Sequence, residues 1–172
     1  MEDQGITQKV RKIYKEWGLP SAEGIDDVIS LIESKRKKKI EVFEHFLPKG
    51  LNGLWAPTSS RDCIFLHIAA TPIHKQHILT HELSHLLLGH TPLLTGSEQI
   101  YTFLTSYITE VRGHLARSSF DAQEEQEAEL MGSLLLSDLV LKQDMRETGI
   151  YNRTTTQYQS ALDALNSFLA DK

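Results

Sequence analysis

The sequence predicts a single small α+β domain, on the basis of three observations. Apolar residues recur at helical spacing near both ends of the chain and in its middle. Between residues 40 and 68, short apolar runs bounded by turn residues are typical of a small β-sheet. A length of 172 residues with 40% hydrophobic content suits one sizeable core. We therefore expect residues 1–172 to form one domain, in which a small mixed sheet packs against helices.

Residues 1–38 are expected to be a helical N-terminal part with two apolar helix faces. The faces consist of Val10, Ile13, Tyr14 and Trp17, then Ile25, Val28, Ile29 and Ile32. Gly18 and Pro20 separate the two helices. Lys35 to Lys39 form a basic run after the second helix. Because the chain carries a net charge of −5, we interpret this run as a solvated helix end rather than a nucleic-acid contact.

Strands are expected at residues 40–46, 54–56 and 63–68. The third run contains Cys63, which we interpret as a small buried residue. Because Cys63 is the only cysteine, the chain has no disulfide framework, which fits a reducing compartment. The N-terminus has no apolar stretch, so we expect neither a signal peptide nor a membrane anchor. These features predict a soluble, cytoplasmic protein.

The pentapeptide His81-Glu82-Leu83-Ser84-His85 is the most informative feature of the chain. Histidines four residues apart on a helix stand one turn above each other, so both imidazoles can bind one metal ion. The glutamate between them can reach a water on the open position of the metal, as in zinc hydrolases. Thr71-Pro72 as a cap and Gly89-His90 as a stop predict the helix that this arrangement needs. The competing interpretation is an amphipathic core helix with surface histidines.

A catalytic zinc site needs a third protein ligand. The extended metalloprotease pattern, with a further glycine and histidine, is absent because Leu88 and Thr91 occupy those positions. His90 is rotated off the side that faces the metal, so we expect it to support a ligand or to lie on the surface. A carboxylate from another helix is the better candidate.

A second helix that can supply this carboxylate is expected from Asp121 to about Lys142. Its buried stripe consists of Ala128, Met131, Leu135 and Leu139, and its first turns carry Glu124, Glu125, Glu127 and Glu129. At least two of these glutamates are expected to be solvated, because acidic residues suit the positive end of a helix dipole. At about 100° per residue, Glu124 and Glu125 lie nearest the stripe, so periodicity leaves both as possible ligands. Glu125 shares its side with the small residues Ala128 and Gly132, which would let two helices approach closely.

The segment His81 to His90, with Glu125-Gln126-Glu127-Ala128 and Leu134-Leu135, resembles the ImmA/IrrE family of HExxH zinc metallopeptidases. The resemblance covers roughly residues 40–140, which would form the catalytic core, and it implies a zincin-like fold around an HExxH active-site helix. It implies Zn²⁺ bound by His81, His85 and Glu125, with Glu82 as the general base. Glu129 would orient a ligating histidine.

The sequence departs from the pattern of that family in three places. Met131-Gly132 replace the usual Phe-Ala, and Ser137-Asp138 replace a usual proline, so the second helix is free to run longer. The spacer formed by residues 91–117 is long and could be a lid or a wall of the substrate groove. Three residues from it are candidates for the proton donor to the oxyanion: Tyr101, Tyr107 and His114. Residues 141–172 are expected to form a helical C-terminal part, with a last helix from about Thr155.

The residues and the resemblance together predict a zinc-dependent endopeptidase. The resemblance implies a regulatory protease that cleaves a helix-turn-helix transcriptional repressor during phage or mobile-element induction or stress. We expect the chain itself to contact neither nucleic acid nor membrane, and residues 63–68 to bind extended substrate as an added strand. Two alternatives stay open: a non-catalytic metal-containing module that binds a partner protein, and a zinc hydrolase of a small molecule. Glu82 disfavours the first, and a closed pocket would favour the second.

Overall fold

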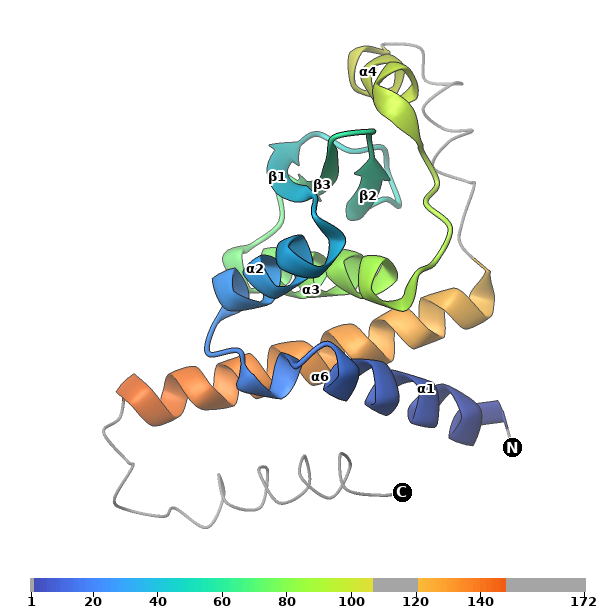
Figure 1. Cartoon of the computed structure of the whole chain (residues 1–172). Helices are drawn as coiled ribbons and strands as arrows, with labels where there is room; N and C mark the ends of the chain where they lie inside the picture. The colour runs from blue at the N-terminus through green and yellow to red at the C-terminus, as the bar shows by residue number, and fades with distance from the viewer. Residues whose placement is uncertain (1, 107–120, 148–172) are drawn as a thin grey trace.

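A three-stranded mixed sheet forms one layer of the fold (Figure 1). Its strands are β1 (Lys39–His45), β2 (Gly53–Pro57) and β3 (Arg61–His67). β3 lies in the centre, parallel to β1 and antiparallel to β2. This computed structural model describes residues 2–106 and 121–147. The three strands lie where the sequence predicts them.

Helices lie on both sides of this sheet (Figure 1), and their combination with a small mixed sheet fits the α+β class that the sequence predicts. α3 (Pro72–Leu88) lies against one face, and α6 (Ala122–Glu147) crosses α3 on the side turned away from the sheet. α1 (Glu2–Glu16) runs beside α6. The 3-10 turn η1 (Leu19–Ser21) leads into α2 (Ile25–Arg36), and α4 (Gly96–Thr105) lies beyond the other face of the sheet.

Alternation along the strands divides the core into two clusters. The larger cluster joins the α3 side of the sheet to α1, α2 and α6, and its strand residues are Trp55, Ile64 and Leu66. The smaller cluster joins the other side to α4, and its strand residues are Leu54, Ala56, Cys63 and Phe65. Cys63 is buried, as predicted, and burial raises the pKa of its thiol.

The expectation that residues 63–68 bind an extended substrate strand is wrong. Nearly all of them belong to β3, and both edges of β3 are already paired, with β1 and β2. The order of strands in a sheet is set by tertiary pairing, which an apolar run in the sequence does not encode. Within the described residues, the free edges of the sheet belong to β1 and β2.

α3 begins and ends where the sequence predicts. The Thr71 hydroxyl accepts a hydrogen bond from the backbone N–H of His74, and Pro72 occupies the first helical position, where an N–H is not needed. Gly89 follows the last turn with φ of 72°, a left-handed conformation that favours glycine.

α6 also begins as predicted, and it extends beyond Lys142, the approximate end expected from the sequence. The carboxylate of Asp121 accepts a hydrogen bond from the backbone N–H of Gln123, which caps the first turn. With Ser137-Asp138 in place of a proline, the helix continues to Glu147. Asp138 is buried and accepts a hydrogen bond from the Tyr14 hydroxyl at 2.7 Å, which ties α6 to α1.

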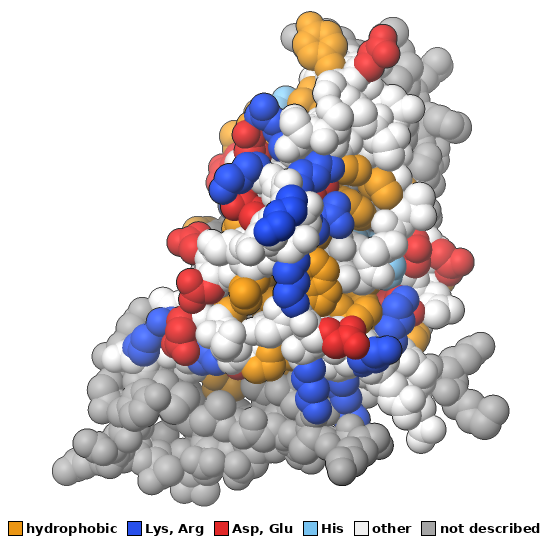
Figure 2. Space-filling view, in the orientation of Figure 1, with side chains coloured by type: hydrophobic (Ala, Val, Ile, Leu, Met, Phe, Trp, Pro, Cys, Tyr) orange, Lys and Arg blue, Asp and Glu red, His pale blue; other side chains and the backbone are white. Residues whose placement is uncertain are grey.

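The basic run at the end of α2 is only partly a solvated helix end. Arg36 and Lys38 lie 3.1 and 3.3 Å from the buried carboxylate of Asp62. The indole N–H of Trp55 donates to the same carboxylate. Figure 2 shows Lys and Arg side chains gathered over this part of the surface with acidic side chains among them. Two residues of the run therefore stabilise a buried charge at the start of β3.

None of the helices in the described part of the chain combines the length and apolar character that a membrane span requires. Several predictions from the sequence lie outside the described residues. These are the proton-donor candidates Tyr107 and His114, the spacer beyond Ser106, and the helix expected from Thr155.

Candidate metal centre

The candidate centre lies where α3 and α6 pass close to each other. Gly132 of α6 faces the backbone of His81, and a Cβ on this glycine would lie 3.1 Å from both N and Cα of His81. Ala128, one turn earlier on α6, is fully buried. Small residues on this side of α6 therefore permit the close approach that the sequence predicts.

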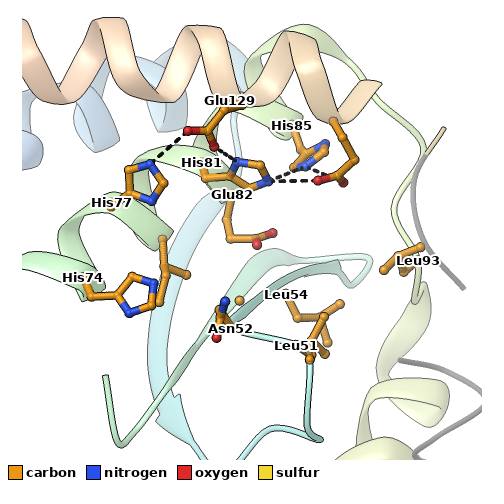
Figure 3. Close-up of a pocket in the computed structure, with 14 residues that line it drawn as sticks. Leu51, Asn52, Leu54, His74, His77, His81, Glu82, His85, Leu93 and Glu129 are labelled. Atoms are coloured by element: carbon orange, nitrogen blue, oxygen red, sulfur yellow. Dashed lines mark hydrogen bonds and ion pairs between the residues drawn. The ribbon is translucent and has the colours of Figure 1, made fainter. Parts of the chain in front are cut away.

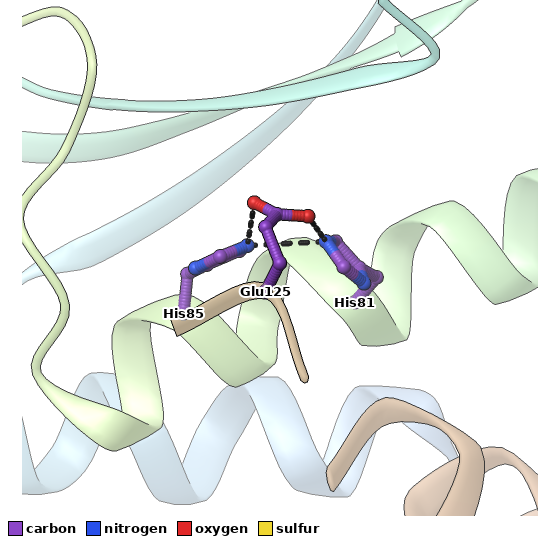
Figure 4. A group of neighbouring side chains, drawn as sticks. All are labelled: His81, His85 and Glu125. Carbon is purple, nitrogen blue, oxygen red and sulfur yellow. Dashed lines mark hydrogen bonds and ion pairs between the residues drawn. The ribbon is translucent and has the colours of Figure 1, made fainter. Parts of the chain in front are cut away.

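Three side chains from these two helices converge (Figure 4). His81 and His85 stand one turn apart on α3, with their Nε2 atoms 3.1 Å apart. Glu125 of α6 places Oε2 3.6 Å from Nε2 of His81 and Oε1 3.4 Å from Nε2 of His85. One possible ligand atom from each residue lies within 4.8 Å of the others. Of the two glutamates that periodicity allows, Glu125 is the one that reaches both histidines.

The partners of the far ring nitrogens indicate that both Nε2 atoms carry lone pairs. Nδ1 of His81 lies 3.3 Å from Oε2 of Glu129, and a carboxylate can only accept, so this nitrogen is the donor. Nδ1 of His85 lies 2.8 Å from Nδ1 of His90, whose Nε2 lies 3.0 Å from Glu127. His90 donates to that carboxylate, so in its neutral form it accepts from His85. With both rings neutral in these tautomers, two lone pairs and a carboxylate face one another, an arrangement that suits a cation between them.

Charge and burial at the centre shift the pKa values of its three side chains in different directions. In the absence of a cation, a proton on Nε2 can bridge to Glu125 instead, and hydrogen bonds with His81 and His85 lower the pKa of Glu125 to about 2, so this carboxyl is ionised. Burial lowers the pKa of His81, but the hydrogen bond to Glu125 and the nearby carboxylates raise it by more, and the net shift is upward. Burial also lowers the pKa of His85, and there it prevails over Glu125. A proton on His81 would compete with a metal ion for the site, so metal affinity is expected to fall as the pH falls.

Glu82 points from α3 toward the segment that leads into β2 (Figure 3). Its side chain is buried, and its Oε2 has no hydrogen-bond partner among the described residues. Burial raises the pKa of Glu82 to about 7, against the opposing effects of His81 and of a backbone hydrogen bond from Trp55. Gly53 makes room for this side chain, since a Cβ there would lie 2.5 Å from Oε1 of Glu82. A buried carboxylate with a pKa near neutrality can take up and return a proton.

Glu129 contacts the far side of His81, where the resemblance places an orienting residue. Besides Nδ1 of His81, it lies 3.2 Å from Nε2 of His77, one turn earlier on α3 (Figure 3). The side chain of Glu129 is 54% exposed. Water therefore competes for this carboxylate.

Sequence reasoning did not anticipate the burial of Glu127. Its side chain is 1% exposed, and it pairs with Lys9 of α1 and accepts hydrogen bonds from Gln123 and His90. His90 is also buried and contacts the ring of His85, so it does not lie on the surface, which was one of the two positions expected for it. The backbone N–H of His90 bonds to the carbonyl of His85, because left-handed Gly89 folds the chain back under the helix end. The sequence signal for this position was the pair Gly89-His90. Because α3 ends at Leu88, the direction of the His90 side chain cannot be calculated from helical periodicity.

The centre opens on a pocket of about 330 Å³ between α3 and the segment that leads into β2 (Figure 3). Besides the three converging side chains, Glu82 and Glu129, its walls include Leu51, Asn52, Leu54, His74, His77, Ile78 and Leu93. Leu93 is the contribution of the described part of the spacer. Tyr101, one of the proton-donor candidates, is 69% exposed on α4 and does not line the pocket.

No protein-family model, curated protein or solved structure matches this chain. The function is therefore argued from the site itself. Its chemistry is that of two imidazole nitrogens and one carboxylate that can hold a metal ion, beside a buried carboxylate that can exchange a proton.

Proposed function

We propose that this chain is a zinc-dependent endopeptidase with a zincin-like active site, similar to the ImmA/IrrE metallopeptidases. The observation that carries the proposal is the convergence of His81, His85 and Glu125 next to the buried carboxylate of Glu82, whose Oε2 has no partner among the described residues. Two imidazole nitrogens and one carboxylate oxygen form a known ligand set of catalytic zinc, which leaves a fourth position for water. In this proposal these three side chains hold Zn²⁺.

The roles of the side chains follow from their positions. Zinc held there would polarise a peptide carbonyl and lower the pKa of a water. Glu82 is the general base, which takes a proton from that water and returns it to the leaving amine. Its position supports this role, because it lines the same pocket and its Oε2 is buried without a partner in the described chain. Glu129 accepts from Nδ1 of His81 and so holds that ring in its ligating orientation.

An extended peptide is the substrate form that suits this pocket. β2 is an edge strand of the described sheet, and residues 50–54, at and before its start, form one pocket wall. A peptide that adds to this edge would pass Gly53, which lies against Glu82. β2 thus takes the role that the sequence suggested for residues 63–68. From the resemblance we further propose a helix-turn-helix transcriptional repressor as the substrate, and the cytoplasm as the location.

The test mixes zinc-loaded protein with the products of the neighbouring genes, among which a helix-turn-helix repressor is the expected substrate. We expect mass spectrometry to find new N-termini in the repressor with the parent chain, and none with a chelator. Glu82→Gln keeps the size of the side chain and removes its basicity, so it should retain about one zinc per chain and lose cleavage. Glu124→Gln is the matched control on α6, and it should cut like the parent.

Each contrary result points to a different error. Absence of zinc after loading would remove the site, and a Glu82→Gln variant that cuts like the parent would remove the base. A parent that binds zinc but cuts neither the repressor nor a peptide mixture from a whole proteome would favour the non-catalytic binding module.

A further inference from the structure

A chain of buried polar contacts leads from the proposed ligand His85 to the N-terminal helix. Nδ1 of His85 lies 2.8 Å from Nδ1 of His90, and Nε2 of His90 lies 3.0 Å from Oε2 of Glu127. Glu127 pairs in turn with Nζ of Lys9, on α1. The side chains of His85, His90 and Glu127 are each at most 2% exposed. The contacts among these three residues therefore form in an interior closed to water, and Lys9, which is 43% exposed, pairs with Glu127 from its edge.

The carboxylate of Glu127 determines which atoms donate and which accept in these hydrogen bonds. Glu127 pairs with Nζ of Lys9 and accepts a hydrogen bond from Gln123 at 2.9 Å, so this carboxylate is an anion that only accepts. His90 then donates from Nε2 and, in the neutral ring, accepts at Nδ1. The donor to that atom is Nδ1–H of His85, which leaves Nε2 of His85 free of a proton on the side that faces Glu125.

We propose that His90 and Glu127 are positioning residues that hold His85 in the tautomer and orientation of a metal ligand, with Lys9 balancing the buried charge. The inference rests on the proposed function, because it assumes that His85 binds the metal. It also makes α1 a functional part of the centre, since the charge that compensates Glu127 comes from that helix. Outer carboxylate–histidine partners of this kind raise ligand basicity and fix the ring.

Geometry explains why this support cannot come from solvent. A buried carboxylate without a cation would be strongly disfavoured. Without Glu127, the Nε2–H of His90 would lack its acceptor. Gln123 donates to the other oxygen of Glu127 at 2.9 Å, which leaves Oε2 directed at His90 and Lys9. Gln123 and His90 therefore donate to different oxygens of Glu127.

The test measures binding of Zn²⁺ and Co²⁺ alone, by chelator competition, and records the absorption spectrum of the cobalt form. His90→Phe keeps the ring volume and removes both nitrogens, so we expect metal affinity to fall about 10–100-fold and the cobalt bands to shift. His90→Asn offers an acceptor and a donor, so it should recover most of the loss. Tyr14→Phe is the matched control, because it removes another buried contact between α1 and α6, and its metal affinity should equal that of the parent.

Unchanged affinity and an unchanged cobalt spectrum in folded His90→Phe would overturn the inference. If that variant does not fold, Glu127→Gln decides, since it keeps the shape and removes the charge. We expect it to bind metal several-fold more weakly, and parent-like binding would overturn the inference. A parent that binds no metal refutes the proposed function instead, so the two failures are distinguishable.

Discussion

The two histidines of the candidate centre differ in how their far nitrogens are held. Beneath His85, the supporting carboxylate is Glu127, which is 1% exposed and reached through His90. Beside His81, the supporting carboxylate is Glu129, which is 54% exposed and contacts the ring directly. Both sides use a carboxylate to accept an imidazole N–H, but one is in the interior and the other is at the pocket rim.

This difference shows that similar contacts can contribute different free energies to stability. An exposed ion pair contributes about 0–1 kcal/mol, because water solvates both partners when they separate. A buried polar group that loses its partner costs about 1–3 kcal/mol, because nothing replaces the contact. We therefore expect His85 to be held rigidly and His81 to adjust its ring more freely.

The largest expected effect on metal affinity comes from substitution of Glu125, which lies near both histidines. Glu125→Ala removes a proposed ligand outright, so metal affinity should fall by more than about 100-fold, beyond the effect of removing a supporting residue. Chelator competition measures this. Glu124→Ala, its neighbour on α6, should bind metal like the parent, and the reverse order would show that the ligand is assigned to the wrong glutamate.

Substituting the two supporting carboxylates tests the comparison directly. Glu127→Ala leaves Lys9, Gln123 and His90 without their acceptor, so the free energy of unfolding should fall by about 2–3 kcal/mol. Glu129→Ala should lower it by less than about 1 kcal/mol. Urea unfolding of the metal-free proteins measures both values. Equal losses would mean that burial does not distinguish the two sides.

A smaller effect is expected where α6 touches α3. Gly132→Ala would place a Cβ 3.1 Å from N and Cα of His81, and backbone atoms cannot rotate away. The helices must separate slightly, which should cost about 1 kcal/mol of stability and weaken metal binding by moving Glu125. Gln126→Ala, at an exposed position of α6, is the control. A stabilised Gly132→Ala variant with parent-like affinity would contradict the close packing.

The smallest effect on metal affinity is expected from substitution of His77, whose ring contacts the exposed carboxylate of Glu129. His77→Ala removes the 3.2 Å contact to Glu129, but water can take its place. Metal affinity should change by no more than about threefold, equivalent to about 0.7 kcal/mol. Competition against the same chelator measures it. A loss as large as that of His90→Phe would mean that the rim supports its histidine as firmly as the interior does.

Local features of the sequence were sufficient to locate most of the elements. Helix ends such as Thr71-Pro72, Gly89 and Asp121 are encoded in a few neighbouring residues, because capping and left-handed turns are local interactions. Apolar spacing likewise located the strands. The order of those strands was not predictable, and the substrate strand was assigned to β3, which is in the centre of the sheet. Strand order depends on pairing between distant segments.

The sequence by itself determined the histidine pair and the carboxylate between them, because residues one helical turn apart must share a face. It also narrowed the third converging residue to Glu124 or Glu125, as helical periodicity allows. Only the tertiary structure decided that Glu125 reaches both imidazoles and that Glu127 is buried against Lys9, 118 positions away. Burial of a charge depends on which distant helix covers it, and no local pattern in α6 specifies that α1 does so.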